Sequence, residues 1–303
     1  MSSGIPQFLS FRVVIAIVVT MKITHSYEGL GLDYIKTRTG IPGFASFVVS
    51  HILPDIIDLS FPLSIIEFGV GSGQQTEFVE KELNRNGLIL YKIIAYDKSY
   101  QSKTTEKPGQ LNVLEERIKR GEISERVVPT HFNFDGTILP FASKSVDFSY
   151  MAHVFHHLNN KQKVLHEIAR ITRQGGRHFI LGATIEDLKQ HPLNEFFPMK
   201  YEYDAKRYPT RFELKQMFKS AGFSYEPPFP LGRNYATPID RAFLAGIENT
   251  TLDSVLRMIK DNDASGFQEG VLRVKKKVER AEKSGSYRAY SSDMVKVFWG
   301  KKT

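Results

Sequence analysis

The sequence predicts an α/β fold in which a doubly wound, mostly parallel sheet is covered by helices on both faces. Short apolar runs alternate along the chain with amphipathic stretches, and a glycine-rich turn follows the first run. This alternation is typical of βαβ units, whose crossover helices cover both faces of a parallel sheet. A length of 303 residues allows one large domain or two smaller ones.

Five apolar runs have the length and flanking turn residues of buried strands. They are residues 63–68, 88–96, 127–132, 146–151 and 178–182. Amphipathic segments separate or follow them; in one, Val164, Leu165 and Ile168 recur at three- and four-residue steps, as on one face of a helix. The helices predicted in this part of the chain are residues 75–84, 110–120, 161–172 and 185–196.

The pattern changes after residue 184. Thr210 precedes a helix predicted at 212–219, which Gly222 ends. A strand-like piece, two helices and a last strand then follow, at residues 225–231, 251–260, 266–282 and 294–299. Because two helices interrupt a pair of strands, we predict a helical cap inserted before the last strand. The predicted division is an extra segment (1–20), an α/β domain (21–236 with 287–303) and the cap (237–286).

Composition excludes several kinds of chemistry. The chain has no cysteine, which removes disulfides, thiolate metal sites and cysteine nucleophiles. His156 and His157 are adjacent and have no third ligand at helical spacing, so no metal site is predicted. The absence of cysteine suits a reducing compartment, and we expect a cytoplasmic protein.

The two ends of the chain are unusual. Residues 8–20 are apolar but too short to span a bilayer, which takes about 20 residues; weak peripheral membrane contact through them is one interpretation. Met21 resembles a translation start, so residues 1–20 are either an extension or an extra packed element.

Residues 271–303 hold ten Lys or Arg and three acidic residues, an excess of seven positive charges that is close to the whole net charge of +8. We interpret this tail as a solvated helix face with a frayed terminus, and binding of nucleic acid or anionic lipid is the alternative.

The turn after the first strand reads Glu67-Phe-Gly-Val-Gly-Ser-Gly and leads into a helix. Glycines let the chain turn sharply and let a ligand approach bare backbone, and the helix offers unpaired N–H groups. The next predicted strand is followed by Asp97, an acid placed to receive ribose hydroxyls. A dinucleotide fingerprint needs glycine or alanine where Gln74 stands, so the loop favours S-adenosylmethionine over a dinucleotide.

These motifs resemble those of class I S-adenosylmethionine-dependent methyltransferases, in particular the small-molecule branch known as methyltransferase type 11. The Glu67 turn resembles motif I, and the run from Asp135 to Phe141 followed by Ser145-Val-Asp-Phe resembles the D-x-x-x-L-P-F…S-F-D signature. Residues 156–158, 167–170, 174–177 and 212–223 continue the likeness in order, so it covers about residues 27–300. The resemblance implies a seven-stranded Rossmann-like sheet and S-adenosylmethionine as cofactor.

The resemblance also implies roles for individual residues. The glycines and Glu67 hold the methionine half of the cofactor, Asp97 holds the ribose, and Asp135 accepts from the adenine amino group. The residues expected at the cofactor are Glu67, Gly69, Gly71, Gly73, Asp97, Lys98, Phe134, Asp135, Gly136, Tyr150, Tyr34 and Arg38. Arg38 is the expected partner of the cofactor carboxylate.

The acceptor is expected beyond the strand that ends near Tyr150-Met-Ala-His153, because open α/β sheets bind ligands at the carboxyl ends of their strands. His153 is the candidate general base, since imidazole titrates near neutrality. The expected substrate-binding residues are Tyr27, His153, Tyr201, Tyr203, Arg207 and Tyr208. Their aromatic rings and guanidinium suit a small aromatic or carboxylate acceptor.

Nucleic-acid substrates are not expected, because the [DN]-P-P-[FY] motif of base and glutamine methylation is missing after this strand. The leading hypothesis is methyl transfer to an oxygen or nitrogen of a small metabolite. Two alternatives stay open: aminocarboxypropyl transfer or cyclisation of the same cofactor, and a cofactor-binding regulatory subunit without catalysis.

Overall fold

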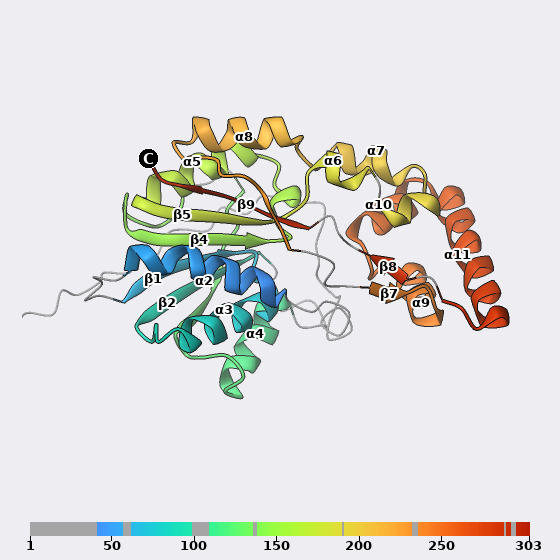
Figure 1. Cartoon of the computed structure of the whole chain (residues 1–303), viewed down its shortest axis with the longest axis horizontal. Helices are drawn as coiled ribbons and strands as arrows, with labels where there is room; N and C mark the ends of the chain where they lie inside the picture. Colours follow the sequence, from blue (N-terminus) through green and yellow to red (C-terminus); the bar gives the residue numbers. More distant parts are fainter. Residues whose placement is uncertain are drawn as a thin grey trace, which may run out of the picture.

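The structure, a computed structural model, describes residues 41–56, 62–98, 109–135, 138–189, 191–231, 236–287, 289–291 and 295–303. Its main element is a seven-stranded sheet with the order β3-β2-β1-β4-β5-β9-β6 (Figure 1). The strands are β1 (Leu63–Phe68), β2 (Tyr91–Asp97), β3 (Val127–His131), β4 (Val146–Ala152), β5 (Thr172–Gly182), β6 (Phe229–Pro230) and β9 (Lys296–Lys301). The first five pair in parallel, and β9 pairs antiparallel with both β5 and β6. The predicted mostly parallel seven-stranded sheet is confirmed.

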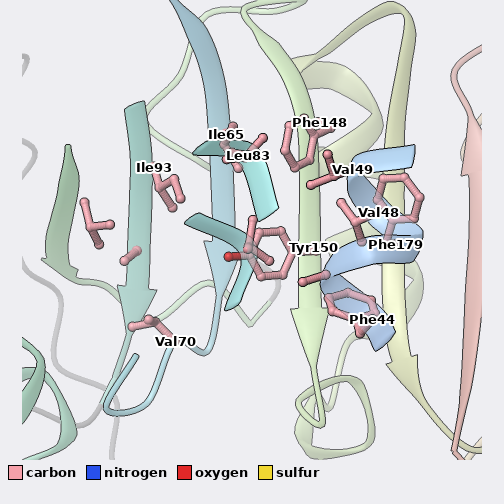
Figure 2. Packing of buried hydrophobic residues seen from close by; sticks show 14 of the residues in the cluster. Phe44, Val48, Val49, Ile65, Val70, Leu83, Ile93, Phe148, Tyr150 and Phe179 are labelled. Atoms are coloured by element: carbon pink, nitrogen blue, oxygen red, sulfur yellow. The ribbon is translucent and has the colours of Figure 1, made fainter. Parts of the chain in front are cut away.

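Each face of the sheet has its own hydrophobic core. On one face, side chains of β1, β2 and β4 pack against α2 (Pro42–Ile56), α3 (Gln74–Arg85) and α4 (Gln110–Lys119). Figure 2 shows Phe148 and Tyr150 of β4 beside Phe44, Val48 and Val49 of α2. On the other face, α5 (Lys161–Ile171) and α8 (Arg211–Ser220) cover the sheet. Two buried faces explain why apolar residues occupy both faces of the central strands, as in Leu63, Ile65 and Ile66 of β1.

The chain order creates a switch point in the middle of the sheet. From β1 the chain proceeds outward to β2 and β3, then returns to place β4 on the other side of β1. Ligands of open α/β sheets bind at such a point, beyond the carboxyl ends of the strands. The loops after β1, β2 and β4 are therefore the ones that the fold brings together for a site.

A third hydrophobic cluster lies outside the sheet. It joins α9 (Arg241–Glu248), α10 (Ser254–Asn262) and α11 (Ala264–Ser284) to Leu193, Phe196 and Phe197. A two-stranded ribbon of β7 (Ala236–Pro238) and β8 (Ala289–Ser291) lies at the base of these helices (Figure 1). The three helices precede the last strand, as the sequence predicts for a helical cap.

One predicted helix is wrong in its extent. Residues 185–196 form two short elements, α6 (Ile185–Leu188) and the 3-10 helix η2 (Pro192–Glu195). Pro192 cannot donate a backbone hydrogen bond and disfavours helical geometry in the residue before it, so one continuous helix cannot pass through it. The helices α2, α7 (Lys200–Ala205) and α9 are additions to the predicted set.

The predicted extra segment, residues 1–20, lies outside the described residues. Within the residues that the structure describes, no helix is both long and apolar enough to cross a membrane.

Candidate functional site

The loop between β1 and α3 depends on three glycines with left-handed backbone. Gly69, Gly71 and Gly73 have φ angles of 74°, 57° and 81°. A Cβ at Gly69 would lie 2.3 Å from Val154, and one at Gly73 would lie 2.6 Å from Leu114. At Gly71 the nearest heavy atom among the described residues would be 3.9 Å away, on Gln110. Packing thus requires Gly69 and Gly73, whereas Gly71 leaves room for a ligand to approach the backbone.

Asp97 closes the site from the neighbouring strand. The N–H of Gly71 donates to Oδ2 of Asp97 at 2.8 Å, and the N–H groups of Gly69 and Val70 donate to the carbonyl of Tyr96. The parallel register of β1 and β2, with Phe68 opposite Tyr96, puts the two strand ends level. The structure therefore brings together the glycine loop and the acid that the sequence predicts as one site.

Glu67 lies beneath the loop and is buried. Its Oε2 accepts hydrogen bonds from the hydroxyls of Thr76, at 2.5 Å, and Tyr150, at 2.7 Å. Burial raises the pKa of Glu67 to about 7, although both hydroxyl donors oppose this rise. The pKa of Tyr150 is also raised, mainly by burial and then by the neighbouring Glu67. Tyr150 is thus a core side chain that holds Glu67, packed against Phe44 (Figure 2).

Phe134 and Asp135 follow β3 at the same edge. Phe134 is buried and its ring packs 5.0 Å from that of Phe68. The carboxylate of Asp135 accepts from the backbone N–H groups of Asn159 and Asn160 and from the side chain of Asn159. Asp135 therefore ties the end of β3 to the residues before α5, and its predicted role toward adenine stays a prediction.

His153 follows β4 and has an unusual backbone. Its φ angle is 57°, and its N–H donates to the carbonyl of Leu181 at 2.9 Å. A positive φ in a residue other than glycine is uncommon, and histidine adopts it more readily than most residues; Lys144 and Thr250 of this chain also have it. The rings of His156 and Tyr208 stack nearby at 4.5 Å with 9° between their planes. This contact connects the loop after β4 to the segment after α7.

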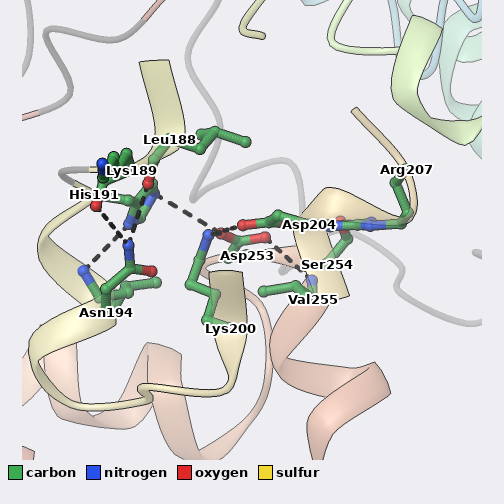
Figure 3. A network of polar contacts seen from close by, with 11 residues as sticks. Leu188, Lys189, His191, Asn194, Lys200, Asp204, Arg207, Asp253, Ser254 and Val255 are labelled. Atoms are coloured by element: carbon green, nitrogen blue, oxygen red, sulfur yellow. Dashed lines mark hydrogen bonds and ion pairs between the residues drawn. The ribbon is translucent and has the colours of Figure 1, made fainter. Parts of the chain in front are cut away.

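The predicted acceptor residues separate into two groups. Arg207 donates to Asp204 at 2.8 Å and to Ser254 at 3.1 Å, inside a buried network that includes Lys200 and Asp253 (Figure 3). Tyr203 packs against the cluster of the cap, and Tyr201 lies on α7 and is partly buried. Tyr208, by contrast, contacts the loop after β4. The structure thus uses Arg207 to build the cap.

Several predicted site residues lie outside the described residues: Tyr27, Tyr34, Arg38 and Gly136. Lys98 is described, directly after β2, and its carbonyl accepts from His131 at 3.1 Å. Sequence reasoning missed three residues that shape the loop. Gln75 binds both backbone groups of Ile41, at the start of α2, and Arg117 donates to the carbonyl of Ser72; Gln110 faces Gly71. Gln75 and Arg117 are 34 and 45 residues from their partners, so no local motif could identify them.

The residues present fit S-adenosylmethionine. A left-handed glycine turn in which no described residue would lie within 3.9 Å of a Cβ at Gly71 suits a close approach to backbone, and the acid at the end of β2 suits a ribose diol. Among the residues that the structure describes, no group of three or more His, Asp or Glu side chains could hold a metal ion.

Comparisons with known proteins identify the kind of domain that this sheet belongs to. Residues 66–180 match a family model described as a methyltransferase domain; no curated protein matches the sequence. The fold is similar to that of the YcgJ protein from Bacillus subtilis, with a TM-score of 0.51, 15% identity and coverage of 84% of this chain and 98% of that one.

Two further solved structures have the same fold. One is a candidate methyltransferase from an antibiotic biosynthesis pathway of Anabaena variabilis, with a TM-score of 0.50, 16% identity and coverage of 84% and 96%. The other is a candidate methyltransferase from Bacillus halodurans, with a TM-score of 0.50, 14% identity and coverage of 84% and 98%. The matched segment contains the glycine loop, Asp97, Asp135 and β4. The chain therefore carries a methyltransferase domain over residues 66–180 and is an enzyme whose fold is shared with these solved methyltransferase structures.

Proposed function

We propose that this enzyme moves the methyl group of S-adenosylmethionine to an oxygen or nitrogen of a small metabolite that carries a carboxylate or an aromatic ring. The observation that supports the choice of cofactor is the hydrogen bond of 2.8 Å from Gly71 to Asp97, at a glycine where an added Cβ would come no closer than 3.9 Å to any described residue. It puts bare backbone and an acid at the switch point of the sheet, where open α/β folds bind their ligands.

The residues around this point have separate roles in the proposal. Asp97 receives the ribose hydroxyls, and the loop from Gly69 to Gly73 lies against the methionine half. Glu67 supports the loop from below through Thr76, which lies in the first turn of the next helix. Phe134 and Asp135 form the adenine side. The bound cofactor supplies a methyl group on a positively charged sulfur, which is already activated for transfer.

The enzyme's remaining tasks are alignment and proton removal. His153 stands directly after β4 with a left-handed backbone, so its side chain leaves the strand at an angle that an extended residue could not adopt. We assign His153 the role of general base, which removes the proton of a hydroxyl or ammonium acceptor. The stacked pair of His156 and Tyr208 forms an aromatic wall between this loop and the cap.

The sequence at the end of β4 favours a small acceptor. It reads Tyr150-Met151-Ala152-His153, without the Asp/Asn-Pro-Pro motif that suits exocyclic amines of bases. The division into an α/β domain (21–236 with 287–303) and a cap (237–286) belongs to the same proposal, with the cap covering the acceptor side.

The test is a screen of metabolite extracts with S-adenosylmethionine labelled in its methyl group. Transfer of label to a small acid or aromatic compound, with S-adenosylhomocysteine as co-product, supports the proposal. Methylthioadenosine as co-product would instead show aminocarboxypropyl transfer or cyclisation. His153→Gln separates the assigned base from binding: kcat should fall and its pH profile change, while cofactor affinity stays the same.

A further inference from the structure

The cap carries a basic groove that has no part in the proposed methyl transfer. It lies between α11 and the end of η2, with a cavity volume of about 490 Å³. Its lining residues are Glu195, Phe196, Ile239, Arg273, Lys276, Lys277, Arg280, Ala281, Ser284 and Ser286. α11 lies at the edge of the molecule, with α10 between it and the sheet in this view (Figure 1). None of the residues that line the groove comes from β1, β2, β4 or the loops that follow them.

The four cations of this groove form one stripe. Arg273, Lys276, Lys277 and Arg280 follow each other at spacings of three, one and three residues, which puts them on one side of the helix. A helix rises about 1.5 Å per residue, so the stripe is about 10 Å long. Four positive charges face one acid, Glu195, and this excess favours a ligand with more than one negative charge.

Half of this charge is available to a ligand. Lys277 pairs with Glu195 at 2.5 Å, and Arg273 donates to the carbonyl of Phe196 and to Glu269. Lys276 and Arg280 are exposed and form no ion pair or hydrogen bond with any residue that the structure describes. Two unpaired cations one helical turn apart can hold one phosphate group between them.

The base of the groove is apolar and fixed. Phe196 and Ile239 are buried members of the cap's hydrophobic cluster, and Ala281 is buried beside them. Arg273 of α11 donates a hydrogen bond of 2.8 Å to the carbonyl of Phe196, directly after η2. This bond connects the two elements that form the sides of the groove. The groove thus combines buried apolar side chains at its base with cations along its rim.

We propose that this groove is a binding site for a phosphate-bearing ligand, separate from the site of methyl transfer. Lys276 and Arg280 hold the phosphate oxygens, and the apolar base accommodates the part next to the phosphate. The shared chemistry is a phosphate group with at least two negative charges, either on a free small molecule or on a lipid headgroup.

Calorimetric titration of the full chain with inorganic pyrophosphate tests the proposal. The double variant Lys276→Gln/Arg280→Gln should bind pyrophosphate at least about tenfold more weakly than the wild type, a loss of about 1.4 kcal/mol or more. Lys275→Gln is the matched control, because Lys275 is exposed on the same helix and does not line the groove. It should retain wild-type affinity, and S-adenosylhomocysteine binding should be equal in all three proteins.

Glu195→Gln gives an independent test in the opposite direction. It removes the acid that neutralises Lys277, so pyrophosphate should bind several-fold more tightly. Flotation with phosphatidylcholine vesicles, with and without phosphatidic acid, distinguishes the source: binding only to phosphatidic acid, lost in the double variant, assigns a lipid headgroup. Equal affinity in the wild type and the double variant overturns the proposal. An equal loss in Lys275→Gln overturns it too, as does binding of single-stranded RNA alone.

Discussion

Gly69 and Gly71 share a left-handed backbone but differ in their surroundings, so the same substitution should have different costs. Alanine in this conformation costs about 1–2 kcal/mol at either position. At Gly69 the new Cβ would also lie 2.3 Å from Val154, and such overpacking adds about 1–3 kcal/mol. Urea unfolding should show a larger loss for Gly69→Ala than for Gly71→Ala. Equal losses would contradict the packing described around the loop.

Glu67 makes stability depend on pH. Its pKa is about 7 when folded and 4.5 in its ordinary range, so its contribution to folding is fully present below about pH 4.5 and is lost as pH rises through about 7. Over this interval the free energy of unfolding of the wild type should fall by up to ~3 kcal/mol relative to Glu67→Gln. Parallel urea titrations at several pH values measure it. A constant difference between the two proteins would show that Glu67 is ionised in the folded state throughout.

At the scale of elements, the cap depends on a buried ion network between α7 and α10. Lys200 is buried and pairs with Asp204, and its Nζ lies 3.3 Å from Oδ2 of Asp253 (Figure 3). Lys200→Met leaves both carboxylates without this cation and should cost about 3–5 kcal/mol. Lys206→Met, an exposed position after α7, should cost less than about 1 kcal/mol. Chemical unfolding of both variants measures this, and equal small losses would show that the network contributes little.

The parallel core was predictable because each parallel strand contains a short apolar run and the crossover helices have an apolar face. The prediction for residues 161–172 differs from α5 by a single residue. The cap was harder to predict, because its cluster combines Leu193 and Phe197 with helices that begin more than 40 residues later. The hydrophobic periodicity of a sequence indicates helices and strands, but it does not indicate contacts between residues so far apart in the chain. Residues 225–231 gave only the two-residue β6, since prolines limit the backbone donors that a strand needs.

The site shows the same division. The glycine turn and Asp97 were predictable because strand register alone brings them together. The position of Arg207 was not, because its role depends on Asp204 and Ser254 in the folded cap. The same holds for Tyr150, whose hydroxyl is directed to Glu67 inside the core.

For the whole molecule, two buried histidines predict acid sensitivity. Burial lowers the pKa of His178 and of His191 to about 3. The ordinary value is 6.5, so both contribute stability above that pH and lose it as pH falls toward 3. Each histidine lowers the free energy of unfolding by about 1.4 kcal/mol for every pH unit below 6.5. Between pH 6.5 and 4.5 the stabilising contribution of Glu67 rises by the same amount per pH unit and cancels the loss from one histidine. The decline should therefore be steeper in Glu67→Gln. Stability that stays constant from pH 6.5 to 4.5 in that variant would contradict the account.

The central claim is that the loop after β1 and the acid after β2 form the cofactor site of a methyltransferase. Calorimetric titration of S-adenosylhomocysteine into the wild type, Asp97→Ala and Gly71→Arg tests it most directly, with Lys275→Gln as a charge-altered control. The account predicts binding in the wild type and the control, and none in the two site variants, all four proteins being folded by circular dichroism. Unchanged binding in both site variants would show that the cofactor lies elsewhere.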